Sequence, residues 1–304
     1  MNGLPGDWGI VEEWLLEGHH VQWPMEGPQP PLAKKWPGVP TLTDYRGGAD
    51  KAFWEKFPYS PLPQKPTTRV NATELKKMLV ESRHRLTAQQ YSRGLAACAS
   101  LLQGADPCLS LSLPAITVPN ADSLFSHGDR FTDKLATWVA SGIVAGPFPT
   151  PPLEGFRSNA MMAVYKHGAV RPVINMSGPK GRSFNDAVAT DKLEKVHMTT
   201  AQQFGYKVRK AGRYSLLSKF DLRDAYKLVP ARKQDWRLQG FQWLGKWFVE
   251  TQMVFGAIPA VASFDQLGHT ILDLTLAKCS IPGKPDRQMP RRRANRGTTP
   301  NRLV

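Results

Sequence analysis

A short hairpin followed by a long helix is the feature that most restricts the fold of this chain. The segments LQGFQW (238–243) and KWFVETQ (246–252) are apolar and aromatic, and only Leu244 and Gly245 separate them. A two-residue connection between such runs predicts a β-hairpin. From Pro259 the sequence predicts a helix, because proline suits a first helical turn. Its expected buried stripe is Val261, Phe264, Leu267, Ile271 and Leu274.

Further strands and helices are expected before this hairpin. AMMAVYKHGAVRPVINMS (160–177) predicts two strands about a turn at His167-Gly168, and YSLLSKFDL (214–222) predicts one strand. Residues 72–103 have a helical pattern with Asn71 or Thr73 as candidate cap, and Thr132 is expected to cap a short helix. Strands and helices in this mixture predict an α+β fold.

Prolines interrupt residues 1–70, so this region is expected to be extended, partly helical or disordered. Its tryptophans argue against a fully solvated tail and are expected to dock on this chain or on a partner; they are Trp8, Trp14, Trp23, Trp36 and Trp54. The predicted division is a Pro/Trp-rich region (1–70), a helical region with a linker (71–124), a main unit (125–282) and a basic tail (283–304).

Several protein classes do not fit the composition. The cysteines, Cys98, Cys108 and Cys279, are odd in number and far apart, which indicates neither a disulfide framework nor a zinc knuckle. The first residues lack the basic start and apolar run of a signal peptide. No uncharged apolar stretch approaches the roughly 20 residues that span a bilayer. We therefore expect an intracellular protein of the cytoplasm or nucleus, without a membrane partner.

The net positive charge comes entirely from one half of the chain. The formal net charge is +15, from 40 Lys+Arg and 25 Asp+Glu. Residues 1–130 hold 13 of each sign, so residues 131–304 hold the remaining 27 basic and 12 acidic residues. A basic half beside a neutral half predicts a polyanionic partner, although a merely soluble basic surface would have the same composition.

Candidate chemistry gathers between residues 160 and 270. Asp221 ends an apolar strand, where a rigid carboxylate could bind Mg²⁺ in a nucleotidyl-transfer site, although an aspartate there is more often a turn residue. Lys166 and Arg171 are expected on facing or adjacent positions of a hairpin. Two such cations could hold a triphosphate, or they could keep a solvated edge from aggregating.

The order and spacing of three motifs resemble the reverse transcriptases of retroelements. VRPVINMSGPKGRSFNDAV (170–188) is similar to their fingers motif, SKFDLRDAYKLVP (218–230) to the first palm motif, and LQGFQWLGKWFVETQMVFGA (238–257) to the palm hairpin and the motif after it. The likeness is greatest to DIRS-like elements, within the wider group that includes LTR-type enzymes, and covers about residues 125–282. It implies the fingers and an incomplete palm of a right-hand polymerase.

The resemblance also implies an activity, partners and residue roles. The activity is RNA-directed DNA polymerisation, with an RNA template, an RNA–DNA duplex and a dNTP as partners, and with Mg²⁺ or Mn²⁺. Asp221 would bind metal and be catalytic, and Asp224 and Ala225 would donate backbone N–H groups to the triphosphate. Tyr226 would exclude a 2′-hydroxyl. Phe255 and Gly256 would shape the nucleotide pocket, and Lys166 and Arg171 would contact phosphates. Asn175 stands where relatives have an acidic residue.

The sequence departs from this family in one decisive motif. An adjacent pair of aspartates is due after the Pro259 helix, but the 304 residues contain no Asp-Asp pair. We therefore expect a C-terminally truncated, inactive fragment of a retrotransposon enzyme. Residues 282–304 hold 7 Lys/Arg and 1 Asp/Glu, which fits either a frameshifted end or a basic tail for RNA binding or nuclear import. The alternative is a nucleic-acid-binding or Gag-like structural protein.

Overall fold

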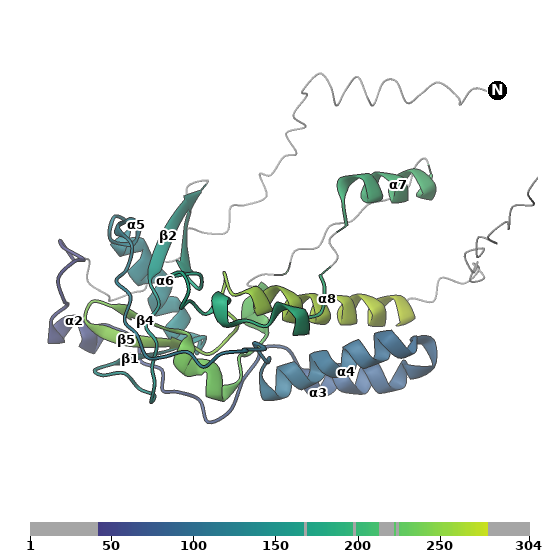
Figure 1. Cartoon of the computed structure of the whole chain (residues 1–304), viewed down its shortest axis with the longest axis horizontal. Helices are drawn as coiled ribbons and strands as arrows, with labels where there is room; N and C mark the ends of the chain where they lie inside the picture. The colour runs from purple at the N-terminus through teal and green to yellow at the C-terminus, as the bar shows by residue number, and fades with distance from the viewer. Residues whose placement is uncertain (1–41, 167–168, 197–198, 213–221, 223–224, 279–304) are drawn as a thin grey trace, which may run out of the picture.

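The computed structural model describes residues 42–166, 169–196, 199–212, 222 and 225–278. Within these ranges helices and antiparallel strands occur together, which agrees with the α+β class (Figure 1). The α-helices are α2 Lys51–Lys56, α3 Ala72–Glu81, α4 Ala88–Gln103, α5 Asp122–Phe125, α6 Gly128–Ala140, α7 Ala201–Ala211 and α8 Ile258–Lys278. The strands are β1 Val144–Phe148, β2 Met161–Lys166, β3 Ala169–Ile174, β4 Gly240–Trp243 and β5 Lys246–Glu250.

The predicted hairpin is confirmed as β4–β5. Gln242 pairs with Trp247 and Trp243 with Lys246, and β1 adds on the other side of β5 to give the order β1-β5-β4. Leu244 (φ 48°) and Gly245 (φ 77°) both have positive φ, as a tight two-residue hairpin turn requires. Leucine rarely adopts this conformation, but here its side chain is buried, so packing offsets the backbone cost.

Helix α6 covers the sheet and corrects the prediction for Thr132. The helix begins at Gly128, so Thr132 lies inside it and caps nothing. Its hydroxyl donates to the Gly128 carbonyl and accepts a hydrogen bond from Trp243 Nε1 at 3.0 Å. The sequence showed a good capping residue, but a buried indole N–H needed an acceptor and Thr132 supplies it.

The helical stretch predicted over 72–103 is two helices rather than one. Helix α3 begins after Asn71, whose side chain accepts from Glu74 N, so this predicted cap is confirmed. The short 3₁₀ helix η1 Arg83–Arg85 follows, and Thr87 and Gln90 form a capping box that starts α4. α3 ends at Glu81 and the reciprocal cap begins α4, so the chain folds back into an αα-hairpin.

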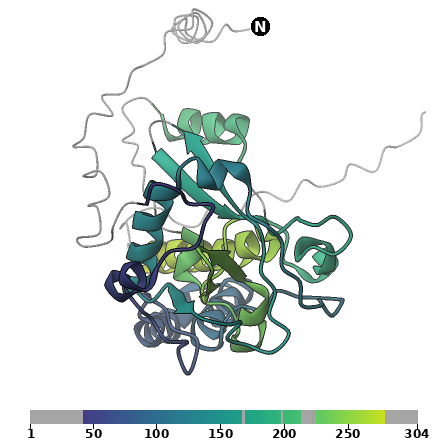
Figure 2. The ribbon, with the colours of Figure 1, turned by 90° about the vertical axis from the view of Figure 1, so that its left-hand side faces the viewer.

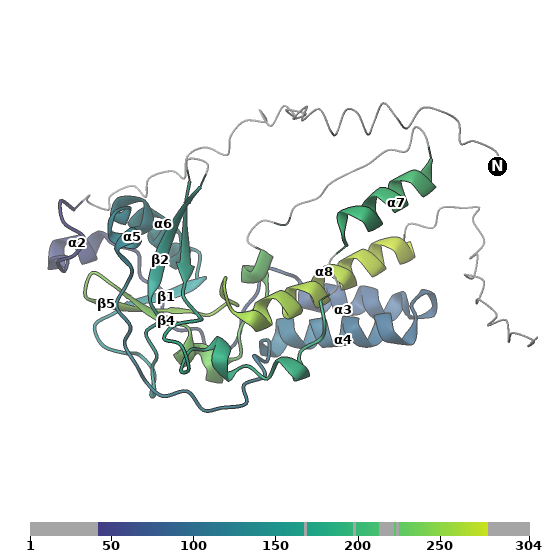
Figure 3. The same ribbon diagram turned by 45° about the horizontal axis from the view of Figure 1, so that its top comes forward.

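Helix α8 lies along α4 (Figures 1 and 3). In the end-on view, α3 and α4 lie below α8 and the β2–β3 hairpin rises above it (Figure 2). Pro259 sits in its first turn as predicted, although the helix begins at Ile258. Of the expected stripe, Leu267 and Leu274 are buried, whereas Ile271 is 36% exposed. The buried face instead includes Ala260, Thr270 and Asp273, because it follows the contact with α4.

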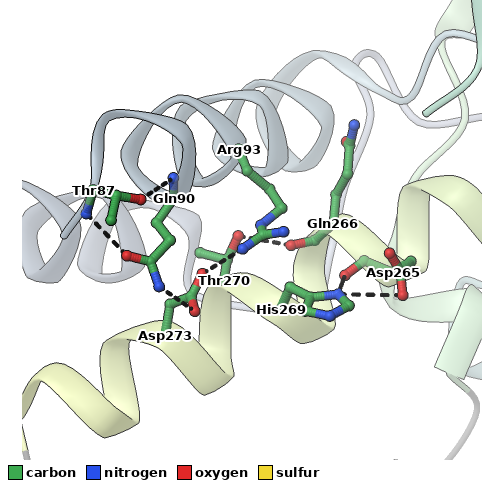
Figure 4. A network of polar contacts seen from close by, with 8 residues as sticks. All are labelled: Thr87, Gln90, Arg93, Asp265, Gln266, His269, Thr270 and Asp273. Atoms are coloured by element: carbon green, nitrogen blue, oxygen red, sulfur yellow. Dashed lines mark hydrogen bonds and ion pairs between the residues drawn. The ribbon is translucent and has the colours of Figure 1, made fainter. Parts of the chain in front are cut away.

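A buried polar network joins α8 to α4 (Figure 4). Asp273 accepts hydrogen bonds from Arg93 Nη2 at 2.7 Å and from Gln90 Nε2 at 2.9 Å. Gln90 also accepts from the Thr87 backbone N–H, so one side chain serves both the cap and the interhelical contact. Both partners of the Asp273–Arg93 ion pair are largely buried. The network therefore fixes how α4 and α8 lie against each other.

The proline-rich segment that precedes α3 packs on the sheet. Trp54 lies 6.2 Å from Phe248 and Phe57 also 6.2 Å from it, between ring centroids. Ser60 exchanges two backbone hydrogen bonds with Gly146. Trp54 thus docks on its own chain, as the tryptophans were expected to do. Trp8, Trp14, Trp23 and Trp36 lie outside the described residues, and the division into four regions stays a prediction.

Three other expectations fall outside the described ranges. They are the turn at His167-Gly168, the strand over 214–222 apart from Leu222, and the basic tail. The two strands on either side of the turn are confirmed as β2 and β3. Among the helices that are described, none is long and apolar enough to cross a bilayer.

We predict that Asp273→Ala lowers the free energy of unfolding by about 3–5 kcal/mol, because it leaves the Arg93 guanidinium buried without its carboxylate. Urea unfolding measures this. Asp265→Ala, a more exposed carboxylate on the same helix, is the matched control and should cost less than about 1 kcal/mol. The double change Arg93→Met with Asp273→Leu should recover most of the loss. Equal losses in Asp273→Ala and Asp265→Ala would contradict a structural role for the pair.

Candidate functional site

Segments far apart in the sequence meet around Tyr226. This residue belongs to the short 3₁₀ helix η4 Ala225–Leu228, which also holds the predicted site residue Ala225. The Tyr226 ring lies 4.9 Å from that of Phe255, before α8, and 5.6 Å from that of Phe264, within α8. The structure thus brings two predicted site residues, Tyr226 and Phe255, into ring contact. Phe255 remains 58% exposed, so this aromatic corner is open to a ligand.

Gly256 forms a close turn against the end of strand β3. Its φ is 99°, which favours glycine, and a Cβ there would lie 3.2 Å from the Ile174 carbonyl oxygen. A side chain at this position would therefore strain the backbone and push the turn away from β3. The glycine in the Phe-Gly motif has a physical requirement that is independent of any family likeness.

Asn185 fixes this turn, a role that its sequence context does not predict. Its Nδ2 donates to the Gly256 carbonyl at 2.8 Å and to Ser177 Oγ at 2.8 Å. Its Oδ1 accepts from the Ile258 backbone N–H at 3.0 Å, at the start of α8. One amide therefore binds both sides of the turn. The only signal in the sequence is its place in the fingers-like motif, which does not reveal a partner 71 residues away.

The β2–β3 hairpin places Lys166 and Arg171 on adjacent rather than facing positions. Arg171 pairs with Val164 and Lys166 pairs with Ala169, so the two cationic residues do not face each other directly. Their backbone positions lie one repeat of the pleat apart. Arg171 is exposed and precedes Ile174, which borders Gly256, by three residues. Asn175 accepts from the Ser177 N–H and so shapes the loop that follows.

A buried arginine supports the loop after β3, which holds Lys180 and Arg182, and its sequence context does not predict this role. Arg157 is 0% exposed and donates through Nη2 to the Arg182 carbonyl at 2.7 Å and through Nε to Asn159 Oδ1 at 3.0 Å. Burial, with the charge of Arg182, lowers the pKa of its guanidinium. Carbonyl dipoles hold this cation in place, which leaves Lys180 and Arg182 on the outside of the loop.

A cavity of about 340 Å³ opens between η4 and α8. Tyr226 and Phe264 form an aromatic wall, and the remaining lining residues are Val196, Val261, Asp265, Gly268, His269 and Leu272. At its rim His269 Nδ1 lies 3.2 Å from Asp265 Oδ1 (Figure 4). Its lining is mostly apolar, and the surface depression is open to solvent.

The described carboxylates do not form a two-metal site. Asp221 and Asp224 lie outside the described residues. Among those described, Glu250 is paired with Lys227, Asp273 with Arg93, and Asp265 with His269. No group of three or more potential metal ligands occurs in the described ranges.

Comparison with solved structures finds foamy viral protease-reverse transcriptases. One in complex with double-stranded DNA is similar at a TM-score of 0.37 and 15% identity, over 68% of this chain and 36% of the other. One in complex with an RNA/DNA hybrid has a TM-score of 0.37 and 16% identity, over 74% of this chain and 29% of the other. The native prototype foamy virus enzyme has a TM-score of 0.35 and 17% identity, over 72% of this chain and 28% of the other. This chain spans about a third of their length.

No protein-family model matches the sequence, and no curated protein does. Structural likeness of this extent does not establish a family, so function has to be argued from the residues and their geometry.

We predict that Asn185→Ala increases hydrogen exchange at the Ile258 amide by roughly twofold to tenfold, because it loses its acceptor. Asn185→Asp keeps an acceptor there and adds a negative charge at the start of α8, so Ile258 should stay protected. Asn175→Ala, which removes a neighbouring amide that contacts only its own loop in the described interactions, is the control. Unchanged hydrogen exchange at Ile258 in Asn185→Ala would show that the Asn185 side chain does not hold this turn.

Proposed function

We propose that this chain is the fingers and part of the palm of a retroelement reverse transcriptase, and that it binds RNA and RNA–DNA duplex. The observation that carries the proposal is the convergence of three motif segments. The Asn185 amide holds the Phe255-Gly256 turn against β3, and Phe255 in turn contacts Tyr226. These motifs resemble reverse-transcriptase motifs in sequence and, although separated along the chain, they form one surface.

In this proposal the open corner formed by Phe255, Gly256 and Tyr226 receives the sugar and base of a nucleotide. An aromatic side chain under the sugar has the bulk to exclude a 2′-hydroxyl. Arg171, exposed on β3, contacts phosphate together with Lys166, because a guanidinium can grip phosphate oxygens through two hydrogen bonds. Ala225 and Asp224 supply backbone N–H groups to the triphosphate.

Metal chemistry belongs to the same proposal. Mg²⁺, or Mn²⁺, would be held through Asp221, and the ion would neutralise charge on the transferring phosphoryl group. One carboxylate is too few for two ions, and the carboxylates of Glu250, Asp265 and Asp273 already have other partners. The 304-residue chain is therefore proposed to bind nucleic acid without polymerising. The alternative is a nucleic-acid-binding or Gag-like structural protein, in which the tryptophan-rich N-terminal half would carry the function.

We predict that the chain binds RNA and RNA–DNA hybrid with little sequence preference, and that its affinity falls steeply between low and physiological salt. Each neutralised phosphate releases counterions, so log K falls with log salt by about 0.7–0.9 per contact. Fluorescence anisotropy at several salt concentrations measures the slope. A protein of similar size and acidic charge is the control. No binding at low salt, or an affinity independent of salt, would contradict the proposal.

We predict no primer extension on an RNA template with either Mg²⁺ or Mn²⁺. The leaving pyrophosphate and the attacking hydroxyl need clustered ions, and the sequence lacks the paired aspartates that hold them. Asp221→Asn distinguishes true activity from contamination. Extension by the wild-type chain that disappears in Asp221→Asn would show a working metal site and overturn this prediction.

A further inference from the structure

An exposed aromatic stack lies on the β2–β3 hairpin, away from the corner described above. Tyr165 is 54% exposed, and its ring stacks on His127 with 5.4 Å between centroids and 18° between planes. The Arg130 guanidinium lies 5.7 Å from the centre of the same ring. His127 immediately precedes α6 and Arg130 lies in its first turn. The stack therefore joins a strand to the start of a helix.

The charged residues of α6 decide how well this face suits a polyanion. On α6, Arg130 and Lys134 are four residues apart and share one side of the helix. Asp129 and Asp133 share a neighbouring side, next to Tyr45, whose pKa is raised by burial and then by these two charges. Asp122 is already paired with Arg46 at 2.7 Å. Of these acidic groups, Asp122 is therefore paired, and Asp129 and Asp133 lie near Tyr45.

The stack is also firmly supported. Tyr165 lies in the regular part of β2, opposite Val170 of β3, and residues Met161 and Ala163 of the same strand are buried against the core. A large aromatic surface held in this way loses little conformational freedom when a flat group stacks on it. Base stacking on such a ring suits any nucleotide, because every base has a π-face.

We propose that Tyr165, with His127 and Arg130, is a base-stacking platform for an unpaired nucleic-acid strand. The inference rests on the proposed function and extends it, since it assigns single-stranded nucleic acid to a surface distinct from the nucleotide corner. Tyr165 receives the base, His127 supports the ring, and Arg130 supplies a cation for the base or for an adjacent phosphate. The simpler alternative is that the stack only caps the hairpin.

The test uses the full chain and three probes, which are oligo-uridylate, oligo-thymidylate and a blunt RNA–DNA duplex. Tyr165→Leu keeps an apolar side chain against α6 but removes the planar ring. It should weaken binding of the single strands about tenfold or more and leave the blunt duplex unchanged. Tyr165→Phe, the matched control, should bind like the wild type. The two unpaired probes separate RNA from DNA as the favoured strand.

Two further variants distinguish stacking from charge. Tyr165→Leu should leave the salt slope unchanged, whereas Arg130→Gln should reduce it by up to about 0.7 for a single strand. Tyr165→Trp should keep the affinity and show added fluorescence that single strands quench. Single-strand affinity of Tyr165→Leu equal to the wild type overturns the platform, and so does an equal loss on the blunt duplex. If the wild type binds none of the probes, the proposed function itself fails.

Discussion

The grip of the Asn185 amide on the turn before α8 is the interaction on which the arrangement of the site depends. It binds the Gly256 carbonyl and the Ile258 N–H together, so the segment after β3 and the first turn of α8 become one unit. Helix α8 then carries Phe264 to Tyr226, and it carries Asp273 to Arg93 of α4. The position of the aromatic corner therefore follows from the way this helix is anchored at both ends.

The buried basic side chains have hydrogen-bond or ion-pair partners within the fold, whereas another group of basic residues lies at the surface. Arg93 and Lys227 are paired with carboxylates, and Arg157 donates to the Gly178 and Arg182 carbonyls and to Asn159 Oδ1, since an uncompensated buried charge is costly. Arg171, Lys180 and Arg182 remain on the surface around the hairpin and its loop. The buried carboxylates Asp235, Glu250 and Asp273 each pair with a basic residue of the fold, whereas these three basic residues lie at the surface, where a polyanion could reach them.

Local sequence rules succeeded where the local structure needs no distant partner. The Leu244-Gly245 turn, the β2–β3 pairing, the Asn71 cap and the proline in the first turn of α8 were all predicted from short patterns. The same rules failed at Thr132, at the break between α3 and α4, and at Ile271. In the first case a buried indole competed for the hydroxyl, and in the last the contact with α4 turned a different face of α8 inward.

By itself, the sequence determined the two hairpins, the helical character of residues 72–103 and of α8, the charge of its second half and the motifs that resemble a reverse transcriptase. These depend on periodicity, turn chemistry and composition, which act over a few residues or over the whole chain. Only the tertiary structure decided that Asn185 binds the Gly256 turn, that Arg157 supports the basic loop, and that Tyr165 stacks on His127. Each of these contacts joins residues far apart in sequence, and their side chains meet only because packing of the core fixes the elements that carry them.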